Sequence, residues 1–130
     1  MFAHLTLPTQ HVEATTRFLE HVLGYARKSV PANSPVDVCW LDIGHGQELH
    51  VFFVDGFVVS PYEAEFGRHV ALFHPRTDLP ALRERVVAEG GEIVDALRAT
   101  PFERVFFREP VNGYVFEVID NERHRQTRAE

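Results

Sequence analysis

The sequence is poor in cysteine and has no long hydrophobic run. Its single cysteine, Cys39, cannot form a disulfide within the chain, which fits a reducing cytoplasm. No apolar stretch approaches the roughly 20 residues that a membrane-spanning helix requires. Residues 1–4 lack a basic region followed by an apolar one, so we expect no secretory signal. We therefore predict a cytoplasmic protein without a membrane partner.

Basic clusters are also missing. The chain carries 13 Lys and Arg against 19 Asp and Glu, a net charge of −6, and no predicted element gathers the basic residues. This argues against nucleic acid and anionic lipid as partners. There is no glycine-rich phosphate loop, so no nucleotide cofactor is predicted. Phenylalanine, in contrast, is abundant, with 11 among 130 residues, and predicts an aromatic-rich interior or interface.

An internal repeat organises the chain. The stretch at residues 67–73 begins the pattern again that His4-Leu5-Thr6-Leu7 opens, and each stretch precedes a proline-containing turn, an amphipathic helix and a run of strands. The separation of His4 from His50 nearly equals that of His69 from Glu117. Each half is therefore predicted to be a βαβββ module.

Hydrophobic periodicity and turn residues give the expected elements. In the first half we expect a helix capped by Thr9 and ending at Leu23, with strands at 3–7, 25–30, 36–43 and 47–54. In the second half we expect a helix ending at about Glu89, with strands at 68–73, 92–97, 105–108 and 114–119. The predicted organisation is one α+β domain over residues 1–130, with module one at 2–55, a linker at 56–66, module two at 67–120 and a polar tail at 121–130. The two modules would form a curved mixed sheet around a concave site, with the helices outside.

Four side chains at matching points of the two halves are candidate metal ligands: His4, His50, His69 and Glu117. Imidazole suits ions such as Zn, Ni, Fe, Mn and Co, and a glutamate adds a hard, charge-balancing oxygen. We predict one divalent ion per site, its identity left open, with two coordination positions available to water or substrate. Because imidazole ligates as the neutral base, metal affinity should fall below about pH 6 to 6.5.

Several other residues have simpler interpretations. A single strand histidine is more often structural than a ligand, and His50 is the weakest of the four candidates. His45 is predicted to be a turn residue, and the histidines expected in solvent are His11, His21, His74 and His124. Arg68 and Arg104 are expected to be surface residues rather than binders of a substrate anion. The aromatic residues expected in the core are Trp40, Phe52, Phe73 and Phe106.

The order and spacing of several short segments resemble the vicinal oxygen chelate superfamily, also called the glyoxalase/bleomycin resistance/dioxygenase family. These segments begin at His4, Phe18, Glu48 and Gly67, and the last is Asn112-Gly113-Tyr114-Val115-Phe116-Glu117. The chain departs from the family pattern in the last turn. Glu109-Pro110 replaces the usual Asp-Pro, one extra residue precedes Gly113, and Tyr114 replaces an asparagine. Many members use three active positions, which here would be His4, His69 and Glu117.

The resemblance implies a metal-dependent enzyme acting on a small oxygen-chelating substrate. In that mechanism the ion chelates two substrate oxygens, polarises a carbonyl and stabilises an enediolate, and Glu117 or a metal-bound hydroxide moves a proton. Lyase or isomerase chemistry fits a redox-inert ion, whereas dioxygenase chemistry requires Fe(II). The alternative is a non-catalytic small-molecule binding protein of the bleomycin-resistance type. Small members of the family are commonly dimers, so a homodimer is expected.

The resemblance also argues against an efficient glutathione-dependent glyoxalase I. In the glyoxalase I proteins that this chain resembles, an Arg follows the first ligand by four residues and an Asn follows the second by four. Here those positions are Pro8 and Val54, and neither side chain offers a partner to the glutathione carboxylates. The second ligand is His50 rather than the glutamate that serves there as a proton-transfer base.

Overall fold

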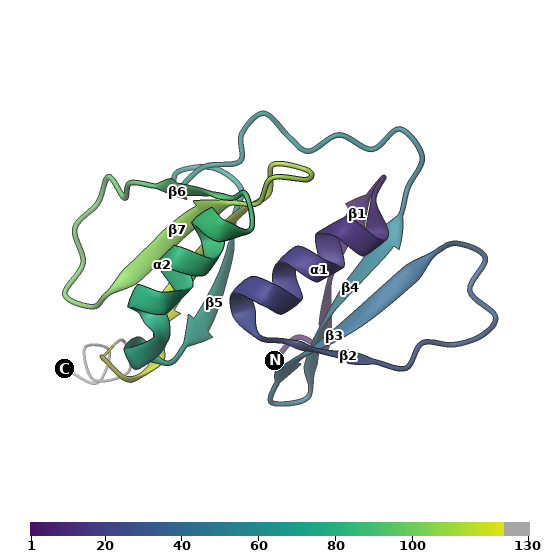
Figure 1. Cartoon of the computed structure of the whole chain (residues 1–130), viewed down its shortest axis with the longest axis horizontal. Helices are drawn as coiled ribbons and strands as arrows, with labels where there is room; N and C mark the ends of the chain where they lie inside the picture. Colours follow the sequence, from purple (N-terminus) through teal and green to yellow (C-terminus); the bar gives the residue numbers. More distant parts are fainter. Residues whose placement is uncertain (124–130) are drawn as a thin grey trace. The chain divides into compact units, whose positions relative to one another are not determined.

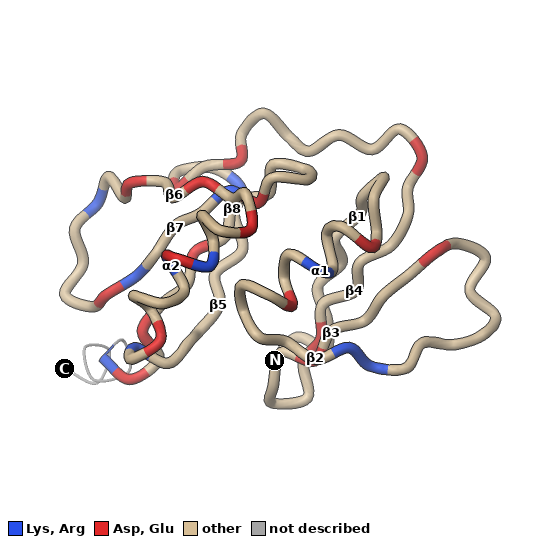
Figure 2. Tube along the Cα trace, viewed as in Figure 1, with Lys and Arg blue, Asp and Glu red and all other residues tan. Residues whose placement is uncertain are grey.

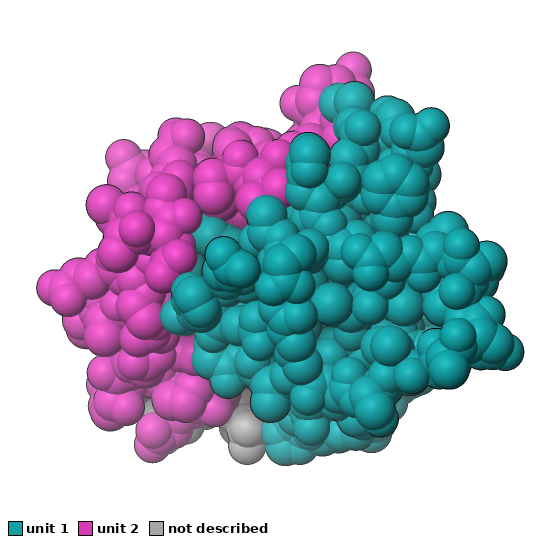
Figure 3. All heavy atoms as spheres, turned by 45° about the vertical axis from the view of Figure 1, so that its right-hand side comes forward, with its two compact units in different colours: residues 1–58 teal, residues 59–130 magenta. Residues whose placement is uncertain are grey.

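The computed structural model of the protein describes residues 1–123, so most of the predicted polar tail, including His124, lies outside the described residues. The chain divides into two compact units, Met1–Val58 and Val59–Glu130 (Figure 3). Each unit contains one four-stranded sheet and one α-helix (Figure 1). The predicted α+β class and the two βαβββ modules are confirmed.

The first unit follows the predicted element order. Its elements are β1 (His4–Thr9), α1 (Val12–Leu23), β2 (Ala26–Lys28), β3 (Val38–Gly44) and β4 (Gln47–Phe53). The sheet order is β1-β4-β3-β2, with β1 parallel to β4 and the other pairs antiparallel. The predicted strand at 25–30 is shorter than expected. The predicted hairpin turn is confirmed, with His45 at a φ of 54° between two glycines that also have positive φ.

Alternation along the strands of the first unit gives its sheet two different faces. The α1 face carries the fully buried side chains of Leu7, Leu41, Leu49 and Val51. Helix α1 ends at Leu23 and is followed by Gly24, which has a left-handed backbone (φ 76°) and donates its N–H to the Glu20 carbonyl. Thr9 is not the N-cap residue, which is His11. Instead, the Thr9 hydroxyl oxygen accepts the His11 N–H at 2.9 Å.

The second unit repeats this arrangement. Its elements are β5 (Val70–His74), the 3-10 turn η1 (Arg76–Asp78), α2 (Leu79–Ala88), β6 (Glu92–Val94), β7 (Arg104–Arg108) and β8 (Val115–Asp120). The sheet order is β5-β8-β7-β6, with β5 parallel to β8. Phe107 and Phe116 stack at 5.4 Å between ring centroids and are fully buried, as are Leu82, Val86 and Val118. Helix α2 therefore covers an aromatic-rich core.

Two residues of β5 differ from expectation. His74 was predicted to be in solvent but is buried, because the strand continues through it and alternation places it on the same face as the buried Leu72. Phe73 was predicted to be in the core but is 54% exposed, because the same alternation directs it to the opposite face. Phe106 is buried as predicted, whereas Trp40 and Phe52 are half-buried.

The turn between β7 and β8 contains the departure from the family's usual Asp-Pro pattern. Glu109 is 1% exposed, and its carboxylate accepts the backbone N–H groups of Val111, Asn112 and Tyr114 at 2.7 to 3.1 Å. Gly113, at a φ of 95°, then leads the chain into β8 with the spacing to Glu117 intact.

Charged residues are distributed along both units. Figure 2 shows basic residues on β2, α1, α2 and the second unit's loops rather than on one element. Among residues 1–123 no helix is long and apolar enough to cross a membrane.

A half-exposed ion pair at the start of α2 predicts an acid-sensitive contribution to stability. The Arg85 guanidinium donates to both Asp78 oxygens, at 2.6 and 3.1 Å. These bonds, and after them the hydrogen bond with His74, lower the pKa of Asp78 to about 2. Because this pKa lies below the ordinary value of about 3.9, the contribution is complete above about pH 4 and is lost as pH falls toward 2. The Asp78 side chain is 37% exposed, so screening limits the effect to about 1 kcal/mol or less.

We expect urea unfolding between pH 5 and pH 2 to show a smaller pH-dependent loss of stability in Asp78→Asn than in the native chain. Asp95→Asn, at an exposed position of the same unit, is the matched control and should follow the native curve. An Asp78→Asn curve parallel to the native one would contradict this assignment.

Candidate functional site

The first unit presents His4 and His50 on the sheet face opposite α1. Strand β4 lies between β1 and β3, and its His50 is in register with Thr6 on one side and Trp40 on the other. His4 and Glu48 are likewise in register. Because alternate residues share a face, these polar and aromatic side chains gather on the side of the sheet that α1 leaves uncovered.

Three rings on this face form one stack. The centroids of His4 and His50 are 3.9 Å apart with 10° between the ring planes, and those of His50 and Trp40 are 4.2 Å apart with 3° between the planes. The lone pair of an imidazole nitrogen lies in the ring plane. The lone pairs of His4 and His50 therefore lie in nearly parallel planes, and at least one ring must turn before both ligate the same ion.

His50 is also tied to a charged pair. Its Nε2 lies 2.8 Å from Glu48 Oε1, and the other Glu48 oxygen accepts Lys28 Nζ. The hydrogen bond from His50, followed by that from Lys28, lowers the pKa of Glu48. This carboxylate therefore stays ionised and fixes the orientation of the His50 ring.

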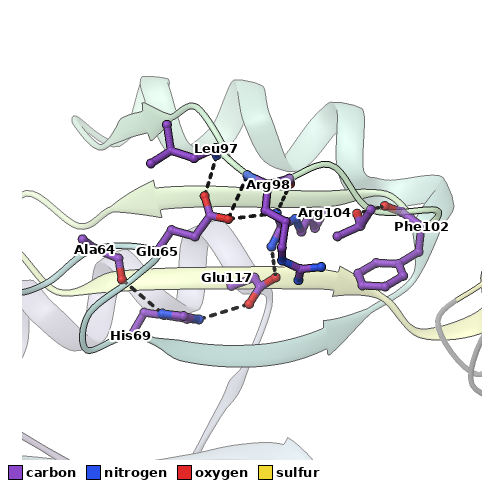
Figure 4. Close-up of polar contacts among 9 residues, drawn as sticks. Ala64, Glu65, His69, Leu97, Arg98, Phe102, Arg104 and Glu117 are labelled. Atoms are coloured by element: carbon purple, nitrogen blue, oxygen red, sulfur yellow. Dashed lines mark hydrogen bonds and ion pairs between the residues drawn. The ribbon is translucent and has the colours of Figure 1, made fainter.

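The second unit brings together His69 and Glu117. His69 lies just before β5 and Glu117 lies in the middle of β8, and His69 Nε2 is 3.1 Å from Glu117 Oε1 (Figure 4). The Glu117 side chain is 9% exposed and that of His69 is 21% exposed. Of the four predicted ligands, these two are in direct contact through atoms that bind metal ions.

The other ring nitrogen of His69 also faces an acceptor. Nδ1 lies 3.1 Å from the Ala64 carbonyl oxygen. A neutral imidazole carries one N–H only, so with Nδ1 donating to Ala64 the Nε2 lone pair points at the Glu117 carboxylate. Two electron-rich atoms in this arrangement require a cation between them, either a proton or a metal ion. A backbone carbonyl that fixes the distal nitrogen is a common feature of metal-ligating histidines.

Arg104 holds the second oxygen of Glu117. Its Nη1 donates to Glu117 Oε2 at 3.0 Å, and its Nη2 donates to Glu65 Oε2 at 3.1 Å and to the Arg98 carbonyl (Figure 4). The guanidinium also lies 4.9 Å from the centre of the Phe106 ring. With a side chain 5% exposed, Arg104 is not the surface residue that the sequence predicted. Its charge balances two buried carboxylates, which explains its burial.

Glu65 connects this cluster to the loop between β6 and β7. Its carboxylate accepts the backbone N–H of Leu97 at 2.6 Å and that of Arg98 at 3.2 Å. The bond from Leu97 contributes most to lowering the pKa of Glu65, and the bonds from Arg98 and Arg104 lower it further. The same bonds explain why the predicted strand at 92–97 ends at Val94, since Leu97 donates to a side chain instead of a neighbouring strand. Sequence reasoning missed Glu65 because it lies in a segment without hydrophobic periodicity.

The predicted ligands thus occur as two pairs, His4 with His50 and His69 with Glu117, one in each unit. In the described part of the chain, no three His, Cys, Asp or Glu side chains form a group with metal-binding geometry. The four-residue ligand set stays a prediction. The residues that the sequence did not identify are Glu65 as a buried carboxylate, Arg104 as the partner of Glu117, and Glu48 as the partner of His50.

Solved structures with the same fold include fosfomycin resistance proteins. FosX from Listeria monocytogenes, as a Glu-to-Gln mutant complexed with Mn(II) and 1S,2S-dihydroxypropylphosphonic acid, matches with a TM-score of 0.78 and 16% identity, over 98% of this chain and 97% of that one. FosX from Mesorhizobium loti matches with a TM-score of 0.71 and 18% identity, over 98% and 97% of the two chains. A hypothetical protein from S. aureus matches at 0.67 and 16% identity, over 92% and 96%.

The family assignment comes from the sequence itself. A search of curated proteins found no match. The profile of the Glyoxalase/Bleomycin resistance protein/Dioxygenase superfamily, however, matches residues 1–118, nearly the whole chain. This agrees with the two βαβββ modules and confirms the resemblance seen in the motifs. The chain belongs to the Glyoxalase/Bleomycin resistance protein/Dioxygenase superfamily.

Proposed function

We propose that this protein is a metal-dependent enzyme that acts on a small substrate with two neighbouring oxygen atoms. Within the superfamily we favour lyase or isomerase chemistry over dioxygenase chemistry. Family membership supports the general class. The observation that carries the proposal is the contact between His69 Nε2 and Glu117 Oε1 at 3.1 Å, with the remaining polar atoms of both side chains already bonded to protein groups.

This pair fits a divalent cation. Ala64 orients the His69 ring, and Arg104 binds Glu117 Oε2, so that Oε1 and Nε2 are the atoms left to ligate. A nitrogen and a hard oxygen together suit Mn, Fe, Co, Ni and Zn. We propose that His4, His50, His69 and Glu117 hold the ion. When bound, the ion supplies Lewis-acid polarisation of the substrate oxygens.

Mn(II) is the first ion to test, because it is bound in the Listeria FosX structure that shares this fold. His50 is the ligand with the greatest conformational cost, since it must leave its stack with His4 and Trp40 and its bond to Glu48. If His50 keeps these contacts, the trio of His4, His69 and Glu117 remains as the ligand set.

Glu117 is also the proposed catalytic residue. Arg104 donates to its Oε2, so Oε1 is the oxygen that would either ligate the ion or, when released from it, accept a substrate proton. The side chains of Arg104 and Glu117 are only 5% and 9% exposed, and such burial strengthens the electrostatic interaction between them. These two residues thus position an acceptor for a proton beside His69, the other proposed ligand in this unit.

The alternative function is non-catalytic binding of a small molecule, as in bleomycin-resistance proteins. It is supported by an apolar cavity in the first unit that requires no metal ion to exist. In either case we propose a cytoplasmic homodimer with a small-molecule ligand and no nucleic-acid partner.

Metal analysis separates the two functions. We expect protein purified after growth in metal-replete medium to contain about one divalent ion per chain, and we expect chelator-treated protein to take up one equivalent of Mn(II) in calorimetric titration. The reason is that His69 Nε2 and Glu117 Oε1, two atoms that bind metal ions, lie only 3.1 Å apart. A chain that contains no metal and takes up none would contradict the enzyme and favour the binding protein.

A further inference from the structure

A cavity of about 350 Å³ lies on the open face of the first unit's sheet. Its floor contains Val38, Trp40 and Phe52 from β3 and β4. Its wall is formed by the loop of residues 31–36, which joins β2 to β3 (Figure 1). His50 lines the same cavity, so a molecule bound here lies next to a proposed ligand. The volume is within the range of small-molecule sites.

The walls of this cavity carry no charge. No lysine, arginine, aspartate or glutamate lines it. Lys28, the cross-strand neighbour of Trp40, is already in an ion pair with Glu48. In the metal-free protein an anionic group would therefore enter without a cationic side chain to balance it, which is unfavourable in an apolar surrounding. The flat rings of Trp40 and Phe52 instead offer surfaces for an uncharged aromatic group.

We propose that this cavity binds an uncharged aromatic group of the substrate. The substrate would then be an aromatic compound with two neighbouring oxygens, and not a phosphonate such as the one bound by Listeria FosX. This inference rests on the proposed function for the role of the two oxygens. The preference of the cavity for an uncharged ring is independent of it, because no metal ion takes part in that contact.

The only tryptophan in the chain provides a direct signal. Trp40 is that residue and lines the cavity, so its emission on excitation at long wavelength reports binding there. The probes are 4-methylbenzyl alcohol and phenylphosphonic acid, which share an aromatic ring and differ in charge. Neither presents a neighbouring pair of oxygens on carbon, and both are titrated into chelator-treated protein.

We expect 4-methylbenzyl alcohol to change the emission of Trp40 saturably and phenylphosphonic acid to bind at least about tenfold more weakly, because burying its charge is unfavourable. Val36→Asp, in the cavity wall, should weaken binding of the alcohol at least about tenfold. Val58→Asp, at an exposed valine outside the cavity, is the matched control and should leave it unchanged. Asn33→Asp adds the same charge to the wall with almost no change in size and serves if Val36→Asp is unstable.

Three results would overturn the inference: no saturable change with the alcohol, equal affinity for the phosphonic acid, or indifference to both wall substitutions. A fourth result would also overturn it, namely that Val36→Asp dissociates a dimer but leaves alcohol binding unchanged. The cavity would then be the place where a second chain binds. Mn(II) uptake is measured on the same protein. Metal uptake without alcohol binding refutes this inference and leaves the proposed enzyme intact, whereas alcohol binding without metal uptake supports the cavity and refutes the enzyme.

Discussion

Replacing Glu117 by glutamine will lower the affinity for Mn(II) on the order of 100-fold or more. The substitution keeps the shape of the side chain and removes the charge that faces His69 Nε2. Loss of an outer partner of a ligand alone costs about 10- to 100-fold, so loss of a charged ligand should cost at least as much. Calorimetric titration of chelator-treated protein measures the affinity directly.

Glu84→Gln is the control for this experiment. Glu84 is an exposed glutamate on α2 of the same unit, and its replacement by glutamine changes the net charge of the protein by the same amount. It should leave Mn(II) affinity unchanged. If Glu117→Gln and a His69→Gln variant both fold normally and bind Mn(II) like the native chain, the metal site does not include this pair.

Replacing Arg104 by methionine will destabilise the protein by about 3 kcal/mol or more. Methionine keeps much of the side-chain volume but leaves the carboxylates of Glu117 and Glu65 buried without their shared positive charge. Removal of one partner from a buried charge pair has a cost of this size because the remaining charge is poorly solvated. Denaturant unfolding followed by circular dichroism measures the loss.

Arg83→Met is the matched control, because Arg83 is exposed on α2 and methionine is a good helix former. It should change the free energy of unfolding by about 0.5 kcal/mol or less. Arg104→Lys should lie between the two, since lysine keeps the charge but not the planar fork that reaches both carboxylates. Equal stabilities for Arg104→Met and Arg83→Met would show that the buried cluster contributes little.

The repeated module could be predicted from the sequence because its signals are local and periodic. Three signals each specify a structure within a few residues: the apolar stripe of α1, the glycine at position 24 after it, and the alternation of apolar and polar residues in β3 and β4. The same alternation places His74 on the buried face of its strand, together with Leu72. Its burial was missed because the strand was predicted to end one residue too early.

The partners of the candidate ligands could not be predicted in the same way. Glu65 and Arg104 are far apart in sequence and neither lies in a pattern that marks it as buried. Glu109 has the same property, because only the fold shows that three backbone N–H groups converge on its carboxylate. Sequence reasoning therefore identified His69 and Glu117 as candidates but not the residues that hold them in place.

The segment that joins the two repeats belongs to the second of them. Glu63 accepts the Val115 N–H and pairs with Arg68, and Glu65 binds Arg104 and the loop after β6. A gene fusion or insertion that respects the folding units should therefore cut the chain near residue 58, where the compact units divide, and not at residue 67, where the sequence repeat begins again. The folding unit is therefore longer than the sequence repeat that marks it.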